Sequence, residues 1–413
     1  MPLALVLVAL AGLAAQRSSD PVAAWTDDVM FLVSELERMH PDPFFGCPRP
    51  EFEAAVDGFM AEIEEDGAKN ATIELMRLMG KLSCKGREGH AVVWPMNARS
   101  VPLQLYRFDD GWFVVDAEGE QRDWIGARLM AIGGVPVEEV CKRIDPLLSR
   151  DNEWNLLLKL GASLLCGDVL AGVGVVPDAA RVRLEFLRDG KSTSVEMATV
   201  TADPSHLWAR QPLPTRDGVT WLEGREESWR LQVLEPEHAL YVQYNEVAPV
   251  DHDQKPLVDF AKEIVRTFEE QKLARVIVDV RSNGGGNNTT FPPLIQALQT
   301  PSIDRPGVLY GLIGRATFSA AGNFVTVLDR DTKATLVGEP TGGAPNQYGD
   351  ARNVVLPNHP DVLVRIATRY HQFGGPADTR LTHEPDLRVP LTSADYFAGR
   401  DPVLRAALEH ETR

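Results

Sequence analysis

Two short stretches of the chain hold residues whose types and spacing could perform chemistry. In the first, RVIVDVRSNGGGNNTT (275–290), a run of Val and Ile ends in the glycines 284–286. In the second, LYGLIGRATFSAAGNFVTVL (309–328), Ser319 follows an apolar run and precedes two alanines. The bare N–H groups of a glycine turn can bind a phosphate or the oxyanion of an acyl-transfer reaction. A serine hydroxyl can act as a nucleophile.

The spacing around the glycines argues against a nucleotide site. A P-loop requires G-x-x-x-x-G-K-[ST] and a dinucleotide-binding turn requires G-x-G-x-x-G. The segment 275–290 contains neither pattern. A structural turn and an oxyanion hole therefore remain as the two interpretations of the glycines alone.

Ser319 stands where a serine commonly caps a helix, and capping is its ordinary interpretation. Here, however, Ala320 and Ala321 leave its hydroxyl unshielded. The N-terminus of the helix that they begin would stabilise a developing negative charge. The glycine turn comes one strand–helix unit earlier, so neighbouring parallel strands would bring both loops to one edge of a sheet. Together these points favour a nucleophile.

Three regions of different texture must position these residues. Residues 237–413 begin with alternating strand-like and helix-like segments, which predict a largely parallel α/β sheet. Val276–Val280 has no polar face, as expected for a strand covered on both sides. Residues 21–82 show amphipathic helical spacing. Residues 91–200 are rich in short strand-like segments and form a linking β-rich region.

Composition limits the partners and the compartment. The chain has 413 residues, 44% hydrophobic and 24% charged, and a formal net charge of −17 that disfavours nucleic acid. Leu3–Ala15 is apolar, too short to span a bilayer but typical of a signal-peptide core, although no Lys or Arg precedes it. We expect residues 1–16 to be a signal peptide, the protein to be periplasmic or extracellular, and no later segment to span the membrane. A short buried or disordered N-terminus is the alternative.

The four cysteines are Cys47, Cys84, Cys141 and Cys166, and none belongs to a CxxC pair. No zinc site is therefore indicated, and we expect no metal and no cofactor. In an exported protein the simplest disulfides would join Cys47 to Cys84 and Cys141 to Cys166. Four free thiols are the alternative.

Three motifs occur in an order that resembles the tail-specific or C-terminal processing protease family. They are DVRSNGGGN (279–287), RATFSAAGNF (315–324) and LVGEPTGGAPN (336–346). Upstream, GARLMAIGGVPVEEV (126–140) is similar to a segment of PDZ domains, with an unrelated hairpin and helix as the alternative. The resemblance implies a ClpP/crotonase-like core of ββα units, preceded by a PDZ-like subdomain and a small helical region.

The resemblance also implies site residues. Ser319 would be the nucleophile, and the backbone N–H groups of Ala320 and Gly285 would form the oxyanion hole. The processing proteases use a Lys shortly after the third motif, but this chain has Ala344 there, so the base lies elsewhere or the site is inactive. The tricorn-like branch takes a His from before the PDZ segment. His90, in KGREGHAVVWP, is in that place.

Further residues are candidates for supporting roles. His371 and His383 are alternative bases. Glu384 is the acid expected to orient the base, because the tricorn-like site has a Glu in the C-terminal part of the core, and Asp350 and Asp386 are the other candidates. Asp279 and Arg281 are expected to hold the glycine loop by pairing with each other, and His40 is expected to be structural.

The sequence thus predicts a serine hydrolase, most readily a peptidase acting on peptide or protein substrates. A catalytically inactive ligand- or peptide-binding protein on the same scaffold is the alternative, since retinoid-binding relatives use this core to hold ligands. Crotonase-like acyl-CoA chemistry shares the core, but it does not explain a serine at the start of a helix.

Overall fold

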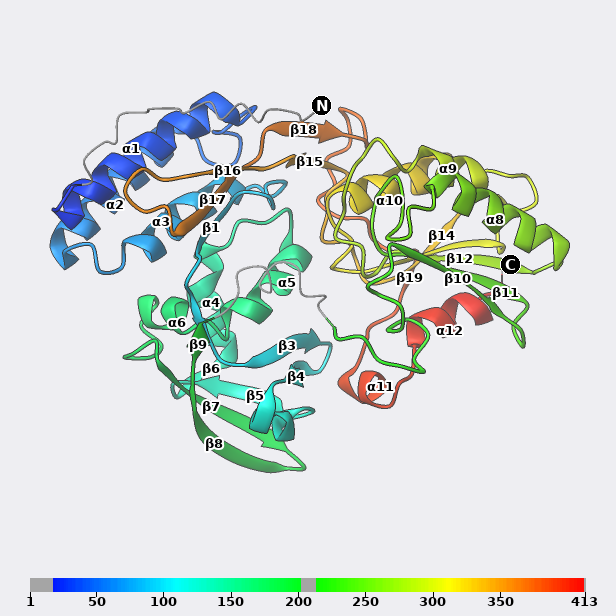
Figure 1. Ribbon diagram of the computed structural model, residues 1–413, viewed down its shortest axis with the longest axis horizontal. Helices are drawn as coiled ribbons and strands as arrows, with labels where there is room; N and C mark the ends of the chain where they lie inside the picture. The colour runs from blue at the N-terminus through cyan, green and yellow to red at the C-terminus, as the bar shows by residue number, and fades with distance from the viewer. Residues whose placement is uncertain (1–17, 202–212, 412–413) are drawn as a thin grey trace, which may run out of the picture.

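The computed structural model describes residues 18–201 and 213–411 (Figure 1). The fold is mixed α/β, as the sequence predicted. One large buried cluster joins the N-terminal helices, the β-rich part and two late strands, and a second lies in the C-terminal part. In Figure 1 the N-terminal helices lie at the upper left, a β-rich part lies below them, and a second α/β part lies to the right. Ser319 belongs to the last of these and His90 to the first half of the chain, so the packing between the parts determines the geometry of the site.

The N-terminal helices are α1 (Pro21–Met39), α2 (Arg49–Asp66) and α3 (Ala71–Gly80). Asp20 caps α1 by accepting a hydrogen bond from the N–H of Val22. Helix α2 ends at Gly67, whose φ of 67° is the left-handed conformation favoured at helix C-termini. The apolar faces of these helices join one buried cluster with the strand that follows them.

That strand belongs to a three-stranded antiparallel sheet assembled from both ends of the chain. Its order is β1 (Val92–Pro95), β17 (Val362–Ile366) and β16 (Arg352–Val354). The connection before β17 is fastened to α1, where the buried carboxylate of Asp28 accepts hydrogen bonds from the backbone of Asn358 and His359. The late strands therefore support the strand that directly follows His90.

The β-rich part is an antiparallel sheet with helices packed beside it. Its strands are β3 (Leu103–Phe108), β4 (Gly111–Ala117), β5 (Arg128–Ile132), β6 (Val135–Pro136), β7 (Arg181–Arg188) and β8 (Lys191–Ala198), with the short pair β2 (Arg99–Ser100) and β9 (Val200–Thr201) nearby. The expected helix from Val137 is α4 (Val137–Ile144). Two further helices, α5 (Glu153–Ser163) and α6 (Gly167–Gly172), were not predicted.

The C-terminal part contains the predicted parallel sheet. Its order is β10 (Trp229–Leu234), β11 (Ala239–Tyr244), β12 (Arg275–Asp279), β13 (Leu309–Ile313), β14 (Thr335–Gly338) and β19 (Leu387–Arg388), and only the β10–β11 pair is antiparallel. Helices α8 (Leu257–Glu270), α9 (Pro292–Leu298) and α10 (Ala320–Asp331) lie on one side of it in Figure 1, and α12 (Pro402–Glu409) on the other, near the short α11 (Ser393–Phe397).

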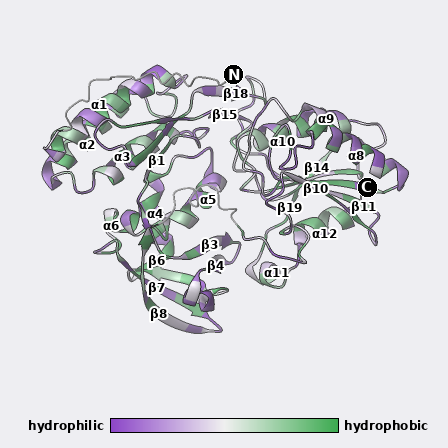
Figure 2. Ribbon diagram, viewed as in Figure 1, coloured by the Kyte–Doolittle hydropathy of each residue, from purple (hydrophilic) through white to green (hydrophobic). Residues whose placement is uncertain are grey.

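Alternation along β12 explains this layering. Val276 and Val278 pack in the cluster formed with α8, α9 and α10, whereas Ile277 packs with residues of α12. Both faces of the strand are therefore covered, as its continuous apolar run predicted. Figure 2 shows the same pattern, with hydrophobic colour along the strands and hydrophilic colour on the outer faces of the helices. A separate hairpin-like pair, β15 (Asn346–Gly349) and β18 (Arg369–Gln372), connects this part to the N-terminal sheet.

The four cysteines are free thiols, so neither proposed disulfide is present. Within the described ranges, none of the helices is both long and apolar enough to cross a bilayer. The predicted signal peptide, residues 1–16, lies outside the described residues.

Candidate active site

The glycine loop after β12 packs directly against the loop that carries Ser319. Strands β12 and β13 are adjacent and parallel, so the two loops meet at one edge of the sheet, as predicted. Gly285 and Gly286 have φ values of 119° and 136°, which other residues rarely adopt. A Cβ on Gly285 would lie 2.7 Å from the Cβ of Ser319. Gly286 likewise has no room, because a Cβ there would meet the carbonyl of Val247. The glycines thus permit a close approach of two backbones.

Charged side chains anchor the base of this loop. The guanidinium of Arg281 donates to Asp279, with Nη2 to Oδ2 at 2.5 Å, and to Asp401 at 2.8 Å. Tyr241 donates its hydroxyl proton to Asp279, and Asn283 Nδ2 donates to the carbonyl of Tyr244 at 2.9 Å. The predicted pairing of Asp279 with Arg281 is confirmed, and Asp401 is a third partner that the sequence did not indicate.

Ser319 precedes α10 but does not cap it. Its φ and ψ are 54° and −126°, and its side chain makes no capping hydrogen bond. A non-glycine residue with positive φ costs on the order of 1–3 kcal/mol, and such residues gather at functional sites. Its Oγ instead lies 2.9 Å from Nε2 of His90. The capping interpretation therefore does not describe this serine, and its hydroxyl has a base within hydrogen-bonding distance.

Buried charged groups hold the loop that presents His90. The N–H of Gly89 donates to Asp151 Oδ1 at 2.6 Å, and its carbonyl accepts from Lys159 Nζ at 2.7 Å. Glu88 accepts from the N–H of Ala91 at 2.8 Å through one carboxylate oxygen. The peptide groups on both sides of His90 are thus fixed by ionisable side chains.

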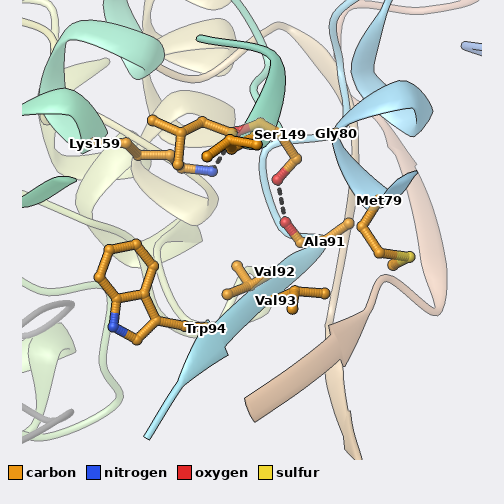
Figure 3. A pocket seen from close by; sticks show the side chains of 10 residues that line it. Met79, Gly80, Ala91, Val92, Val93, Trp94, Ser149 and Lys159 are labelled. Carbon is orange, nitrogen blue, oxygen red and sulfur yellow. Dashed lines mark hydrogen bonds between the residues drawn. The ribbon is translucent and has the colours of Figure 1, made fainter. Parts of the chain in front are cut away.

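The same cluster extends further on both sides. The second oxygen of Glu88 lies 2.6 Å from His40 Nε2, which gives His40 the structural role expected of it. Lys159 also donates to the carbonyl of Ser149 at 2.6 Å, and the Ser149 hydroxyl donates to the carbonyl of Ala91 (Figure 3). We call Glu88, Asp151 and Lys159 the charge cluster; it is connected to the loop of His90 through backbone groups.

Desolvation dominates the titration of Asp151 and Lys159. It raises the pKa of Asp151 to about 7, against the hydrogen bonds from Ala344 and Gly89 that lower it. It also lowers the pKa of Lys159 to about 8, while the charges of Asp151 and Glu88 act in the opposite direction. A lysine and two carboxylates removed from bulk water are stable here only in one another's presence.

His90 is held as a neutral imidazole. Desolvation is the largest cause that lowers its pKa to about 3, and the charges of Lys159 and Arg365 add to it, with only the backbone carbonyl of Tyr348, as an acceptor, opposing. The ring stacks on Phe318, with centroids 4.6 Å apart. Among the residues described, no side chain bonds to Nδ1. The imidazole can accept a proton through Nε2, but no carboxylate is present to stabilise the imidazolium.

The structure does not bring the expected acids to His90. Glu384 is 63% exposed in its side chain, and its recorded contact is a loose one with Arg388 at 3.9 Å. Asp386 accepts a hydrogen bond from the N–H of Leu336 at 2.8 Å, which is a structural role. Asp350 Oδ1 lies 3.2 Å from His371 Nε2. A solvated Glu384 has its charge satisfied by water, so nothing draws it toward the imidazole.

The alternative bases have other partners. His383 is buried and its Nε2 lies 2.8 Å from the hydroxyl of Thr326. His371 faces Asp350 and, at 3.5 Å, the amide of Asn288. His90 is the histidine that contacts Ser319.

The two expected oxyanion donors differ in availability. The N–H of Ala320, at the N-terminus of α10, has no acceptor in the part of the chain that the structure describes. The N–H of Gly285 donates to Asn283 Oδ1 at 2.9 Å and is occupied. Gly284, one residue earlier, borders the adjoining cavity and has open space around its Cα.

A cavity of about 710 Å³ opens beside Ser319 and His90, between the β-rich and C-terminal parts. This volume is within the usual range of ligand sites. Its wall combines apolar and aromatic side chains with several cations. Its lining residues include Ser319, His90, Phe318, Gly284, Trp94, Val92, Arg107, Glu118, Lys159, Arg315 and Arg365.

Comparison with known proteins supports a shared fold. No protein-family model matches the chain. Mature CPAF complexed with lactacystin aligns with a TM-score of 0.63 and 13% identity, over 95% of this chain and 100% of that chain. The photosystem II D1 C-terminal processing protease aligns with a TM-score of 0.39 and 13% identity, over 90% and 93% of the two chains. The tricorn protease aligns with 0.40 and 13%, over 94% of this chain and 36% of that chain.

The CPAF alignment spans nearly the whole of both chains, so the architecture is common to both from the N-terminal helices to α12. The resemblance to the tail-specific protease family, first indicated by three motifs, is confirmed at the level of the fold.

Sequence reasoning missed the charge cluster. Asp151 and Lys159 come from the segment before and within α5, which was not predicted to be a helix. A signal existed, because Lys159 is the lone cation of the apolar stretch EWNLLLKLGAS. A charge in such a stretch calls for a buried partner.

Proposed function

We propose that the protein is a serine peptidase in which Ser319 is the nucleophile and His90 the general base. The observation that carries the proposal is the 2.9 Å contact between Ser319 Oγ and His90 Nε2, made by a serine that does not cap its helix and that borders a large cavity. The fold shared with CPAF agrees with this activity.

In the proposed reaction, Ser319 Oγ attacks the carbonyl carbon of a peptide bond while His90 Nε2 takes the hydroxyl proton. The Ala320 N–H and the N-terminus of α10 stabilise the oxyanion. The glycine loop supplies the second donor, Gly285, once Asn283 releases it. Collapse of the intermediate gives an acyl-enzyme, and the imidazolium donates its proton to the leaving amine. Water, activated by the same imidazole, then hydrolyses the ester.

We extend the proposal to finer assignments. The parallel sheet with α8–α10 and α12 is assigned as a ClpP/crotonase-like core, and the antiparallel sheet with α4 as a PDZ-like subdomain that binds an extended peptide. The apolar N-terminal run supports export to the periplasm or outside the cell. N-terminal sequencing of the protein recovered from the culture fractions tests export; a retained Met1 in the cytoplasm would contradict it.

Labelling with a fluorophosphonate tests the catalytic assignment. The wild type and the exposed-serine control Ser192→Ala should be labelled, whereas Ser319→Ala should not, and its hydrolysis of casein should fall by a factor on the order of 10⁴ or more. His90→Ala should be labelled much more slowly. Labelling of Ser319→Ala at the wild-type rate would reject the nucleophile. Peptide binding without turnover, equal in the wild type and Ser319→Ala, would instead indicate a binding protein.

A further inference from the structure

The cavity beside Ser319 has a charge opposite to that of the whole chain. The chain carries a formal net charge of −17. The cavity, however, is lined by four cationic residues, Arg107, Lys159, Arg315 and Arg365, and by one acidic residue, Glu118. A cleft lined by one sign of charge concentrates field lines and attracts ligands of the other sign. The cavity is therefore suited to an anionic group.

Three of the four cations already have partners. Arg315 forms a two-pronged ion pair with Glu339, at 2.7 and 3.0 Å. Lys159 is a member of the charge cluster. Arg107 donates to the carbonyl of Phe108 and, at 3.3 Å, to that of Asp109. The N–H groups of these three side chains thus already donate hydrogen bonds to carboxylate or carbonyl oxygens of the protein itself.

Arg365 differs from Arg315, which has a carboxylate partner, and from Arg107 in that its buried Nε finds no acceptor. Within the described ranges no carboxylate lies within 4 Å of its guanidinium; its Nη2 donates to the carbonyl of Ala351 at 3.1 Å, and its buried Nε has no acceptor. Burial lowers the pKa of Arg365 below its ordinary value, yet a guanidinium remains protonated in proteins. A partly buried guanidinium without a negatively charged partner is unfavourable, unless a bound anion supplies that partner.

The strand register directs Arg365 into the cavity. On the β1–β17 ladder it stands opposite Val92. Alternate residues of a strand share a face, so Val92, Trp94 and Arg365 lie on one face of this sheet. All three line the cavity, and Figure 3 shows Val92 and Trp94 on their strand near Lys159.

Arg365 also acts on the catalytic base, since its charge is one of the causes that lower the pKa of His90. An anion paired with the guanidinium would offset this effect. His90 would then accept the proton of Ser319 more readily. An anionic substrate bound at Arg365 would therefore also raise the proton affinity of His90.

We propose that Arg365 binds a carboxylate of the substrate, so that the favoured substrates are peptides with a carboxylate close to the scissile bond. This inference rests on the proposed peptidase activity. The carboxylate can belong to an Asp or Glu side chain or to the C-terminus of the peptide. Both present the same chemistry to a guanidinium, which pairs with carboxylates in a planar, two-bond geometry.

Cleavage profiling tests the inference. A chymotryptic digest of casein, incubated with the enzyme and analysed by mass spectrometry, should show carboxylates enriched at one position near the cleaved bonds. Arg365→Met should abolish the enrichment and Arg365→Glu should invert it toward Lys and Arg. The control Arg352→Gln, an exposed arginine of the neighbouring strand β16, should keep it. Retained enrichment in Arg365→Glu, or none in the wild type, would overturn the inference.

Synthetic peptides separate the two sources of the carboxylate. The best peptide is made with Glu or Gln at the enriched position, each with a free or an amidated C-terminus. Removing the carboxylate that Arg365 binds should lower kcat/KM about 10- to 100-fold in the wild type, and little in Arg365→Met. Equal values for all four peptides would contradict the proposal.

Two readouts separate this inference from a general loss of structure or activity. Arg365→Met should raise the pKa of the acid limb of kcat/KM, because a cation near His90 has been removed. Fluorophosphonate labelling of Ser319 should be slowed more by N-acetylglutamate than by N-acetylglutamine in the wild type, and equally in Arg365→Met. Normal labelling with no such difference would reject the carboxylate site and leave the peptidase standing; absence of labelling would reject both.

Discussion

The two halves of the proposed catalytic pair, Ser319 and His90, are positioned by different means. Ser319 lies at the edge of a parallel sheet, where strand order and the close approach of Gly285 place it with short-range contacts. His90 comes from a loop 229 residues away in sequence and is held by ionisable side chains around its peptide groups. The first arrangement depends on backbone geometry and the second on buried charge. Perturbations should therefore act on the two halves in different ways.

The largest effect on the His90 half is expected from Lys159→Met. It removes the donor to the carbonyls of Gly89 and Ser149 and leaves two buried carboxylates without their cation. Leaving buried charge uncompensated in this way costs about 3–5 kcal/mol, and kcat should fall on the order of 100-fold as His90 loses its position. Urea unfolding and peptide kinetics measure both.

A double variant distinguishes charge from simple packing. Asp151→Asn removes the surplus negative charge, so Lys159→Met combined with Asp151→Asn should be less destabilised than the sum of the single variants. Additive losses would show that the charge cluster does not act as a unit.

The position of Ser319 should be sensitive to a single methyl group added on the glycine loop, in both stability and kcat. Gly285→Ala places a Cβ 2.7 Å from that of Ser319 at a φ of 119°. We expect a loss of about 1–3 kcal/mol in the free energy of unfolding and a fall in kcat on the order of 10-fold. Gly284→Ala is the matched control, because its Cβ would meet no atom within 4 Å. If both variants unfold at the same urea concentration, the close approach is not what requires glycine.

The pH profile compares the two halves by another route. His90 must be neutral to accept a proton, and its pKa is lowered to about 3. Activity that depends on it should persist as pH falls through 6.5, the ordinary value, and decline only near the lowered pKa. Measuring kcat/KM from pH 3.5 to 8 checks this. Asp151 has a pKa raised to about 7 and could itself produce a pH dependence in this range, so the same profile must be measured in Asp151→Asn. A fall of kcat/KM with a pKa near 6.5 in both proteins would show that His90 titrates as an ordinary histidine, contrary to this prediction.

The smallest effect is expected from Glu384→Gln. The side chain is exposed and distant from the contacts of His90, so kcat/KM should stay within about twofold of the wild type. A fall of two orders of magnitude would mean that Glu384 reaches the imidazole during catalysis, as the family resemblance implied.

The same contrast explains what could be predicted from the sequence. The apolar run before Gly284 and the alternation around it specify a buried parallel strand, so the sheet and the position of Ser319 follow from local patterns. His90 was found through motif order. Helix α5 and its Lys159 were not expected, because their role appears only when Glu88 and Asp151 are brought beside them. The expectation that Glu384 would orient the base failed for a similar reason, since no local sequence pattern shows that its side chain stays in solvent.

Strands β16 and β17 show a further limit of sequence reasoning. They lie after the third motif, but they pair with β1 under the N-terminal helices. Such a pairing depends on contacts across most of the chain, which periodicity does not encode. The position of Arg365 opposite Val92 could not be predicted for the same reason.

The ladder between β1 and β17 also sets the order in which the protein can become active during its synthesis. The strand that follows His90 gains its neighbour only after the ribosome has passed Ile366, well beyond Ser319. A nascent chain that already contains both Ser319 and His90 therefore still lacks the strand pairing that supports His90. The cell that makes the protein is exposed to a complete site only after translation has passed Ile366.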